Sequence, residues 1–237
     1  MADLTMQNVP TEGGENRLSQ GTGLHTSNSV GVAQGIAIIV LASVLFAVIG
    51  ISAGKFFFWN NYDKTSKIER EFVANQERVK ADPNNPLNHV QLGWSYFLKG
   101  DNERAIGEYK KALAIDPKNY NAQYNMGLAY LQNQQYDRAV TCLKDAIQIV
   151  PNAFGPHLNL GISYVKLEKY EDALKELSLA YKSNPGSPET FYWKGTAYEK
   201  QGKLDLAFNE YETAINFDPN YKTAKEAYER LKKTLNK

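Results

Sequence analysis

The sequence predicts an all-α protein in which helix hairpins stack into a solenoid, preceded by a single transmembrane helix. Three observations indicate this fold class. Four copies of a 34-residue unit follow one another in the C-terminal part of the chain. In each copy, apolar residues recur at helical spacing in two segments. A long apolar segment without any charged residue lies ahead of the four copies.

Composition limits the classes of function that the chain can have. Its 237 residues carry a formal net charge of +1, which argues against binding to nucleic acid. The single cysteine, Cys142, cannot form an intrachain disulfide, and its half-apolar helical position indicates a structural thiol. The sequence contains no P-loop, no G-x-S-x-G and no H-E-x-x-H motif. We therefore expect no enzymatic activity, no cofactor and no metal site.

The N-terminal part predicts a tail and a membrane anchor. Residues 1–34 are rich in Gly, Ser, Thr and Asn, so we expect a flexible polar tail. Residues 35–54, "GIAIIVLASVLFAVIGISAG", hold no charge and are long enough as a helix to span a bilayer. The following "KFFFWNNY" is typical of the membrane interface. A cleaved signal peptide is the alternative, but this segment is too long, starts too late and lacks a basic leader.

The flanks of residues 35–54 carry information on topology and association. Lys55, Lys64, Lys67 and Arg70 follow this segment closely, which slightly favours the cytoplasm for the C-terminal repeats. Exported proteins tethered by one N-terminal helix have the same organisation, so the exported side stays open. Within the segment, Gly50 and Gly54 form a small-residue pair of the kind that lets membrane helices approach closely. Weak homo-oligomerisation through these two glycines is therefore a further expectation.

Five residue types recur every 34 residues in the C-terminal part. Each unit contains two apolar-periodic segments, and a recurring proline closes the second because proline cannot continue a helix. Each unit is therefore expected to be a helix hairpin. The recurring residues are Gly93, Gly127, Gly161 and Gly195; Tyr96, Tyr130, Tyr164 and Tyr198; Ala105, Ala139, Ala173 and Ala207; Ala112, Ala146, Ala180 and Ala214; and Pro117, Pro151, Pro185 and Pro219.

This Gly, Tyr, Ala, Ala, Pro pattern at a 34-residue period resembles the tetratricopeptide repeat family. The resemblance covers 86–221 without insertion or deletion. It implies a right-handed superhelix whose concave face is lined by the first helix of each hairpin and binds a peptide or helix of a partner protein. The implied domains are repeats at 86–119, 120–153, 154–187 and 188–221, a juxtamembrane linker and helix at 55–85, and a solubilising capping helix at 222–237.

Packing expectations follow from the same register. We expect Gly127 on one helix and Ala139 on the other to let the two backbones approach closely. The large residue usual near the start of the first helix is replaced by His89, Gln123, His157 and Phe191, which predicts thinner core contacts. Lys194 stands where Leu or Met stands in the other copies, so we expect the last repeat to pack more loosely. Upstream, the helix from about residue 64 to 80 carries Glu71 and Arg78 in place of the two signature alanines.

The family register also assigns residues to the concave groove. These residues are mostly aromatic, aliphatic or amide side chains, and one asparagine recurs in successive repeats, so the groove suits an apolar or helical ligand. A carboxylate clamp is disfavoured, because its basic positions hold no basic residue here. Single members could instead pack between hairpins. The candidate groove residues are Val90, Trp94, Phe97, Asn121, Tyr124, Asn125, Leu128, Leu158, Asn159, Ile162, Val165, Tyr192, Trp193 and Thr196.

Two classes of function follow. The first is a membrane-tethered scaffold or adaptor that binds a partner protein, with a role in assembling a membrane or secreted complex; tethering raises the local concentration of groove and partner. The alternative is a structural membrane protein that assembles with itself and has no dedicated peptide ligand.

Overall fold

The structure is a computed structural model, and it describes residues 67–236. The expected tail at 1–34, the expected transmembrane helix at 35–54 and the start of the linker lie outside these residues. Within 67–236, no helix combines the length and the hydrophobicity that crossing a bilayer requires.

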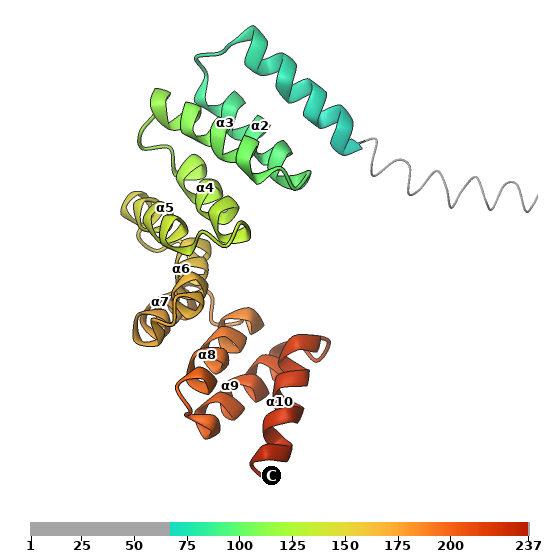
Figure 1. Cartoon of the computed structure of the whole chain (residues 1–237), viewed down its shortest axis with the longest axis vertical. Helices are drawn as coiled ribbons and strands as arrows, with labels where there is room; N and C mark the ends of the chain where they lie inside the picture. The colour runs from blue at the N-terminus through green and yellow to red at the C-terminus, as the bar shows by residue number, and fades with distance from the viewer. Residues whose placement is uncertain (1–66, 237) are drawn as a thin grey trace, which may run out of the picture. The chain divides into compact units, whose positions relative to one another are not determined.

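The described part of the chain is all helical. Residues 67–81 form a helix, and four hairpins and a final helix follow it in chain order (Figure 1). Sequential helices pack against each other along the whole series, as expected of a helical solenoid. The helices are α2 (Pro86–Leu98), α3 (Asn102–Ile115), α4 (Tyr120–Gln132), α5 (Tyr136–Ile149), α6 (Phe154–Lys166), α7 (Tyr170–Ser183), α8 (Pro188–Lys200), α9 (Leu204–Phe217) and α10 (Lys222–Thr234).

Local sequence sets where several of these helices begin. The side chain of Asn85 accepts a hydrogen bond from the backbone N–H of Leu87 at the start of α2, where Pro86 occupies the first helical position. Asp101 and Asn119 cap α3 and α4 in the same way. These side chains satisfy N–H groups that have no partner within the helix.

The turn inside each hairpin repeats the same backbone geometry. One residue lies in the left-handed region, and the amide N–H of the next residue donates to the carbonyl oxygen of the repeated tyrosine at 2.9 Å in all four hairpins. The first and last turns use glycine, for which this conformation carries no steric cost. The positive-φ residues are Gly100 (79°), Gln134 (59°), Glu168 (60°) and Gly202 (76°).

The recurring glycines lie where the two helices of a hairpin meet. A Cβ atom on Gly127 would lie 2.9 Å from Leu143 Cγ, and one on Gly93 would lie 2.6 Å from the ring of Tyr109. The side chain nearest to Gly127 is that of Leu143, one turn beyond Ala139 on α5. In the equivalent pair of the third hairpin, a Cβ atom on Gly161 would lie 3.3 Å from the carbonyl oxygen of Ala173, which is the close approach of the backbones expected at the glycine and alanine positions.

Lys194 of the last hairpin is paired with a residue of α9. Lys194 does not leave a gap, because its Nζ atom lies 2.6 Å from Glu210 Oε1 and both side chains are 18% exposed. The same ammonium group lies 5.7 Å from the ring centroid of Phe191, which is itself stacked on Phe217. The long aliphatic chain of lysine packs while its charged end is paired, so a lysine can replace the apolar residue of the other copies.

The helix at 67–81 packs on α2 as the second helix of a hairpin would. Phe72 meets Tyr96 edge-on at 5.1 Å between ring centroids, and Asn75 Nδ2 donates to Ser95 Oγ at 2.8 Å. At the other end, Leu231 of α10 is 3% exposed and belongs to the same buried cluster as residues of α9. Each end of the described solenoid is thus covered by one helix.

Candidate functional site

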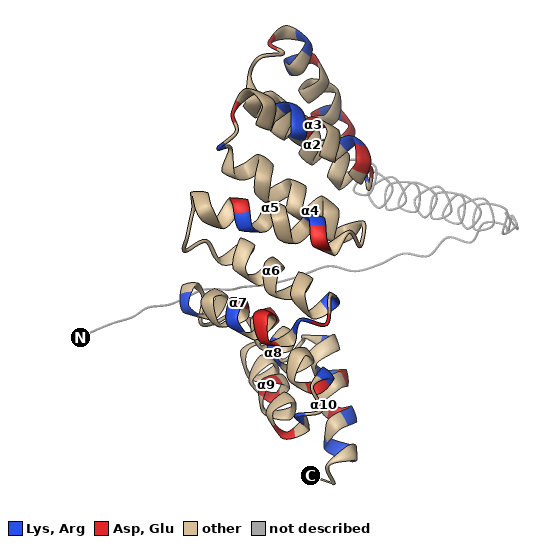
Figure 2. Cartoon of the chain, turned by 60° about the vertical axis from the view of Figure 1, so that its left-hand side comes forward, with Lys and Arg blue, Asp and Glu red and all other residues tan. Residues whose placement is uncertain are grey.

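The first helices of the hairpins are nearly free of charged residues in the first three repeats. Helices α2 and α4 contain no Asp, Glu, Lys or Arg, and α6 contains only Lys166, its last residue. The second helices α3, α5 and α7 each carry four or more such residues. In Figure 2 the ribbon of α6 is accordingly tan except at its end. Apart from Lys166, the charges of the first three hairpins therefore lie on the second helices and the turns.

A cleft of about 410 Å³ opens between the helix at 67–81, α2 and α4. It holds four of the candidate groove residues, which are Val90, Trp94, Asn121 and Asn125. The structure thus places these four candidate residues around the same cleft. The other lining residues are Glu71, Ala74, Asn75, Arg78, Gln91, Ser95 and Leu98.

Trp94 is the largest exposed apolar side chain of this cleft. It is 39% exposed, and its ring stacks on Phe97 at 5.1 Å between centroids with an interplanar angle of 20°. Leu98, one turn further along α2, is 49% exposed. An aromatic ring that is held by a neighbour yet open to solvent is the kind of residue that contributes most to protein interfaces.

The amide groups of Asn125 and Asn159 have different surroundings although they are equivalent in register. Asn159 Nδ2 donates to Tyr124 Oη at 3.2 Å and to the carbonyl oxygen of Gly155 at 2.9 Å. A Cβ atom on Gly155 would lie 2.5 Å from Tyr124 Oη, so only glycine leaves room for this hydroxyl. Burial raises the pKa of Tyr124, which therefore stays a neutral hydrogen-bonding group. Asn125 lines the cleft instead.

The candidate groove set is divided by burial. Asn121 is exposed. The half-buried members are Phe97, Tyr124, Asn125, Leu128, Asn159, Tyr192, Trp193 and Thr196. Thr196 is engaged within its own hairpin, where Tyr211 Oη donates to its hydroxyl at 3.3 Å. The members buried by this chain's own packing are Val90 (6% exposed), Leu158 (5%), Ile162 (7%) and Val165 (7%).

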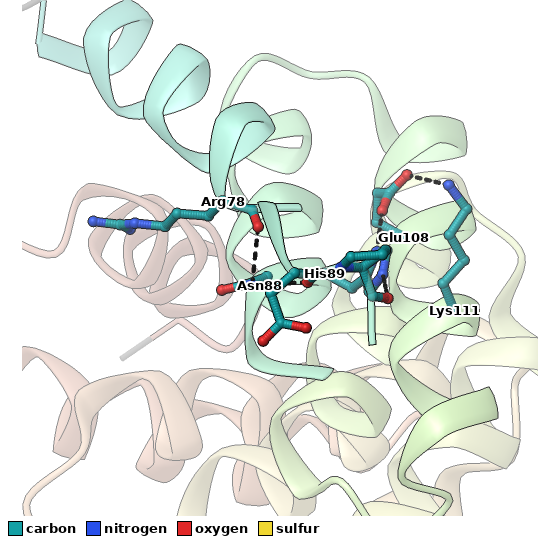
Figure 3. A network of polar contacts seen from close by, with 7 residues as sticks. Arg78, Asn88, His89, Glu108 and Lys111 are labelled. Atoms are coloured by element: carbon teal, nitrogen blue, oxygen red, sulfur yellow. Dashed lines mark hydrogen bonds and ion pairs between the residues drawn. The ribbon is translucent and has the colours of Figure 1, made fainter. Parts of the chain in front are cut away.

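Two buried histidines make equivalent contacts in two of the repeats. One stabilises the first hairpin and the other stabilises the third. His89 Nδ1 lies 2.7 Å from Glu108 Oε2, and its Nε2 lies 2.9 Å from the carbonyl oxygen of Pro83 (Figure 3). His157 repeats this arrangement with Glu176 at 2.7 Å and with a proline carbonyl at 2.8 Å. Each ring thus ties the loop before a first helix to the following second helix. These are structural contacts inside the hairpins, and neither histidine lines the cleft.

Sequence reasoning missed part of the cleft. The helix at 67–81 contributes Glu71, Asn75 and Arg78, which were assigned to a linker. Arg78 Nη1 donates to Asn75 Oδ1 at 2.9 Å and to Gln91 Oε1 at 3.1 Å. The signal that could have found these residues is the 34-residue offset, because Asn75 stands at the position of Tyr109 and Arg78 at that of Ala112. In the complete hairpins these positions face the first helix.

Sequence comparison settles the family of the repeats. A family model described as "TPR repeat" matches residues 93–134 and 129–168, and one described as "Tetratricopeptide repeat" matches 158–222. Together they cover more than half of the chain. The chain belongs to the tetratricopeptide repeat family. No curated protein sequence matches this tetratricopeptide repeat chain.

Solved structures of other tetratricopeptide repeat proteins resemble the chain. A crystal structure of MamA is 25% identical, with a TM-score of 0.61, and the match covers 69% of this chain and 94% of that one. YrrB, described as a TPR protein with an unusual peptide-binding site, is 20% identical with a TM-score of 0.61 over 72% of this chain and 88% of its own. TTC0263 of Thermus thermophilus is 20% identical with a TM-score of 0.58 over 72% and 93%. The resemblance shows a common tetratricopeptide repeat fold.

Proposed function

We propose that this chain is a membrane-tethered scaffold that binds a peptide or helical segment of a partner protein, with an apolar face, in its concave groove. The observation that carries the proposal is the lack of charged residues on α2 and α4 and their near absence from α6. The surfaces of α2 and α4 offer apolar contacts and amide hydrogen bonds, and they contribute no counter-charge for a carboxylate or a phosphate. The charged residues of the cleft, Glu71 and Arg78, come from the helix at 67–81. Assisting the assembly of a membrane or secreted complex is the role that fits such a scaffold.

The similarity to known structures supports the class of ligand. YrrB has the same fold and is described as having a peptide-binding site, although a shared fold alone does not transfer a ligand. The side chains of this chain make the narrower argument. Trp94 lies on α2 and Trp193 on α8, and the amide of Asn125 lies on α4 between them in chain order. A partner segment would place apolar side chains against the two tryptophans and backbone groups against the amide of Asn125.

The tether belongs to the proposal as well. Residues 35–54 have the length and hydrophobicity of one membrane span, and anchoring would confine groove and partner to one plane, which raises their effective concentration. The distribution of Lys and Arg favours the cytoplasmic side for the repeats. Protease treatment of intact spheroplasts tests this topology. Protection of 67–237 is the expected result, and digestion before lysis would place the repeats outside.

A single charge placed in the groove tests the binding function. Leu128→Glu puts a carboxylate on the uncharged face of α4, whereas Leu206→Glu puts the same group on α9, where the leucine is 47% exposed. We expect Leu128→Glu to reduce the recovery of crosslinked partner proteins from membranes by tenfold or more, roughly the effect of burying an unpaired charge.

The control variant Leu206→Glu should recover the partners as the unchanged chain does. Circular dichroism of both variants separates lost binding from lost folding. Equal recovery with folded Leu128→Glu would contradict the proposal. If, in addition, the span or the repeats formed defined oligomers, the self-assembly alternative would replace it.

A further inference from the structure

The helix at 67–81 lacks a first helix of its own among the described residues. In the four hairpins, the positions of Ala105, Tyr109 and Ala112 and their equivalents are fully or almost fully buried against the preceding first helix. The corresponding positions on the helix at 67–81 are Glu71, Asn75 and Arg78, and all three line the cleft. The cleft therefore lies along the face that a first helix covers in every complete hairpin.

The chemistry of this face differs from that of the complete hairpins. Alanines at these positions let two helices of one chain approach closely, as in Gly161 against the backbone of Ala173. Here a carboxylate and a guanidinium replace the alanines, seven residues or about 10 Å apart along the helix. Arg78 contacts two amide oxygens, of Asn75 and Gln91, and neither carries a charge. Glu71 is exposed. Neither charge is neutralised within the cleft.

The geometry points to an amphipathic α-helix of a partner protein that docks in this cleft and completes the hairpin. This inference rests on the proposed function, because it assigns the first part of the same groove to a ligand of stated chemistry. The occupant's apolar face covers Trp94 and Leu98, which are 39% and 49% exposed. Its two charged residues, seven positions apart, pair with Glu71 and Arg78.

The direction of the occupant follows from the hairpin geometry. Two helices joined by a short turn run antiparallel, and the occupant takes the place of the helix that would precede residue 67. Its N-terminal half then lies opposite Arg78 and its C-terminal half opposite Glu71. The acidic residue of the occupant therefore comes first and the basic residue seven positions later. This order also suits the dipole of the docked helix.

Two labelled peptides of about 18 residues, long enough to be helical, test the inference. Both have one Leu and Ala face; one peptide places Glu seven residues before Lys, and the other exchanges the two charges. Fluorescence anisotropy with the full chain in detergent micelles measures binding. We expect the Glu-first peptide to bind about tenfold more tightly, because exchange turns two attractive contacts into two repulsive ones. Trp94→Ala should weaken the binding of both peptides.

Charge exchange in the protein provides the decisive comparison. Glu71→Lys combined with Arg78→Glu should reverse the preference between the two peptides, which also shows that the variant is folded. Glu103→Lys combined with Lys110→Glu is the matched control, since these exposed residues of α3 have the same charges and the same spacing. The control should leave the preference unchanged.

Several results would overturn the inference. They are equal affinity for the two peptides, no binding of either peptide, a preference for the Lys-first peptide, or a preference that ignores the exchange of Glu71 and Arg78. Dimers of the full chain that dissociate in the exchanged variant would assign the cleft to a second copy. Peptide binding that requires removal of residues 1–66 would assign it to the chain's own N-terminal segment. If Leu128→Glu still reduces partner recovery tenfold or more in any of these cases, the proposed function stands and only this inference fails.

Discussion

The recurring positions require glycine, because side chains of the opposite helix leave no room for a Cβ atom. A Cβ atom on Gly161 would lie 2.6 Å from Leu177 Cγ and 3.3 Å from the carbonyl oxygen of Ala173. Leu177 is fully buried, so it cannot move aside without disturbing the core. The cost of glycine in a helix, about 1 kcal/mol relative to alanine, is offset by this close packing.

Gly161→Ala should therefore lower the free energy of unfolding by roughly 1–2 kcal/mol, since overpacking outweighs the gain in helix propensity. Gly107→Ala is the matched control, because no atom lies within 4 Å of its added Cβ in α3. The control should raise stability by about 0.5–1 kcal/mol. Urea unfolding followed by circular dichroism measures both variants. A raised midpoint for Gly161→Ala would show that the contact with Leu177 is not limiting.

Cys142 gives a pH dependence at the residue scale. Burial, followed by the negative charge of Asp145, raises the pKa of its thiol from about 9 to about 11. Burial likewise raises the pKa of Tyr109 and of Tyr211. In each case the unfolded chain releases its proton at a lower pH than the folded chain. The contribution of the neutral thiol to the free energy of unfolding is therefore fully present below about pH 9, and it is lost as the pH rises towards 11.

Cys142→Ala should make the decline between about pH 9 and 10 less steep, because the remaining tyrosines titrate higher. Urea midpoints measured across this range test the expectation. In the unchanged chain, the thiol should react slowly with a disulfide reagent at about pH 8 and rapidly in urea, since it is 5% exposed when folded. Equal rates in both states would show that the thiol is accessible.

At the scale of the element, the hairpins have different pairs of side chains at the same positions. The first and third pair His89 with Glu108 and His157 with Glu176. The second has Gln123 opposite Cys142 at these positions. A buried pair of polar groups is stable only while both members are present, because a buried group without a partner keeps its full desolvation cost.

Glu176→Leu should therefore cost about 2–4 kcal/mol, because it leaves Nδ1 of His157 without its hydrogen-bond partner. His157→Gln combined with Glu176→Cys copies the residues of the second hairpin and should cost less than the single change. A double-mutant cycle by thermal unfolding compares the variants. If the double variant is the less stable one, the histidine contributes through packing and the hydrogen-bonded pair is secondary.

At the scale of the whole described solenoid, each hairpin contacts only its neighbours. Stability in such a series is nearly a sum of local terms. Leu231 of α10 is 3% exposed and packs with Phe208 and Tyr211, so it supports the last hairpin and no other.

Leu231→Ala should destabilise the last hairpin by about 2–4 kcal/mol. Hydrogen exchange should show lost protection in α8 to α10 and unchanged protection in α2 to α4. Leu206→Ala, at a position 47% exposed, is the control and should change neither region. Uniform loss of protection after Leu231→Ala would mean that the solenoid unfolds as one unit.

The hairpins were predictable because their signals are local. The 34-residue register, the prolines and the helical spacing of apolar residues identify helices that the structure shows within a few residues. The side chains that contact Gly127 and Lys194, which are Leu143 and Glu210, were not predicted. Both contacts depend on which side chain of the opposite helix is nearest, and spacing along one helix does not contain that information.

The sequence by itself determined the number and order of the hairpins and the uncharged character of the first helices in the first three repeats. Only the tertiary structure decided which residues of those helices are open to a ligand. Val90 and Trp94 both line the cleft, but one is 6% exposed and the other 39%. It also brought Glu71 and Arg78 into the cleft. Exposure is set by neighbours that are distant in sequence, and a repeat pattern describes only what successive units share.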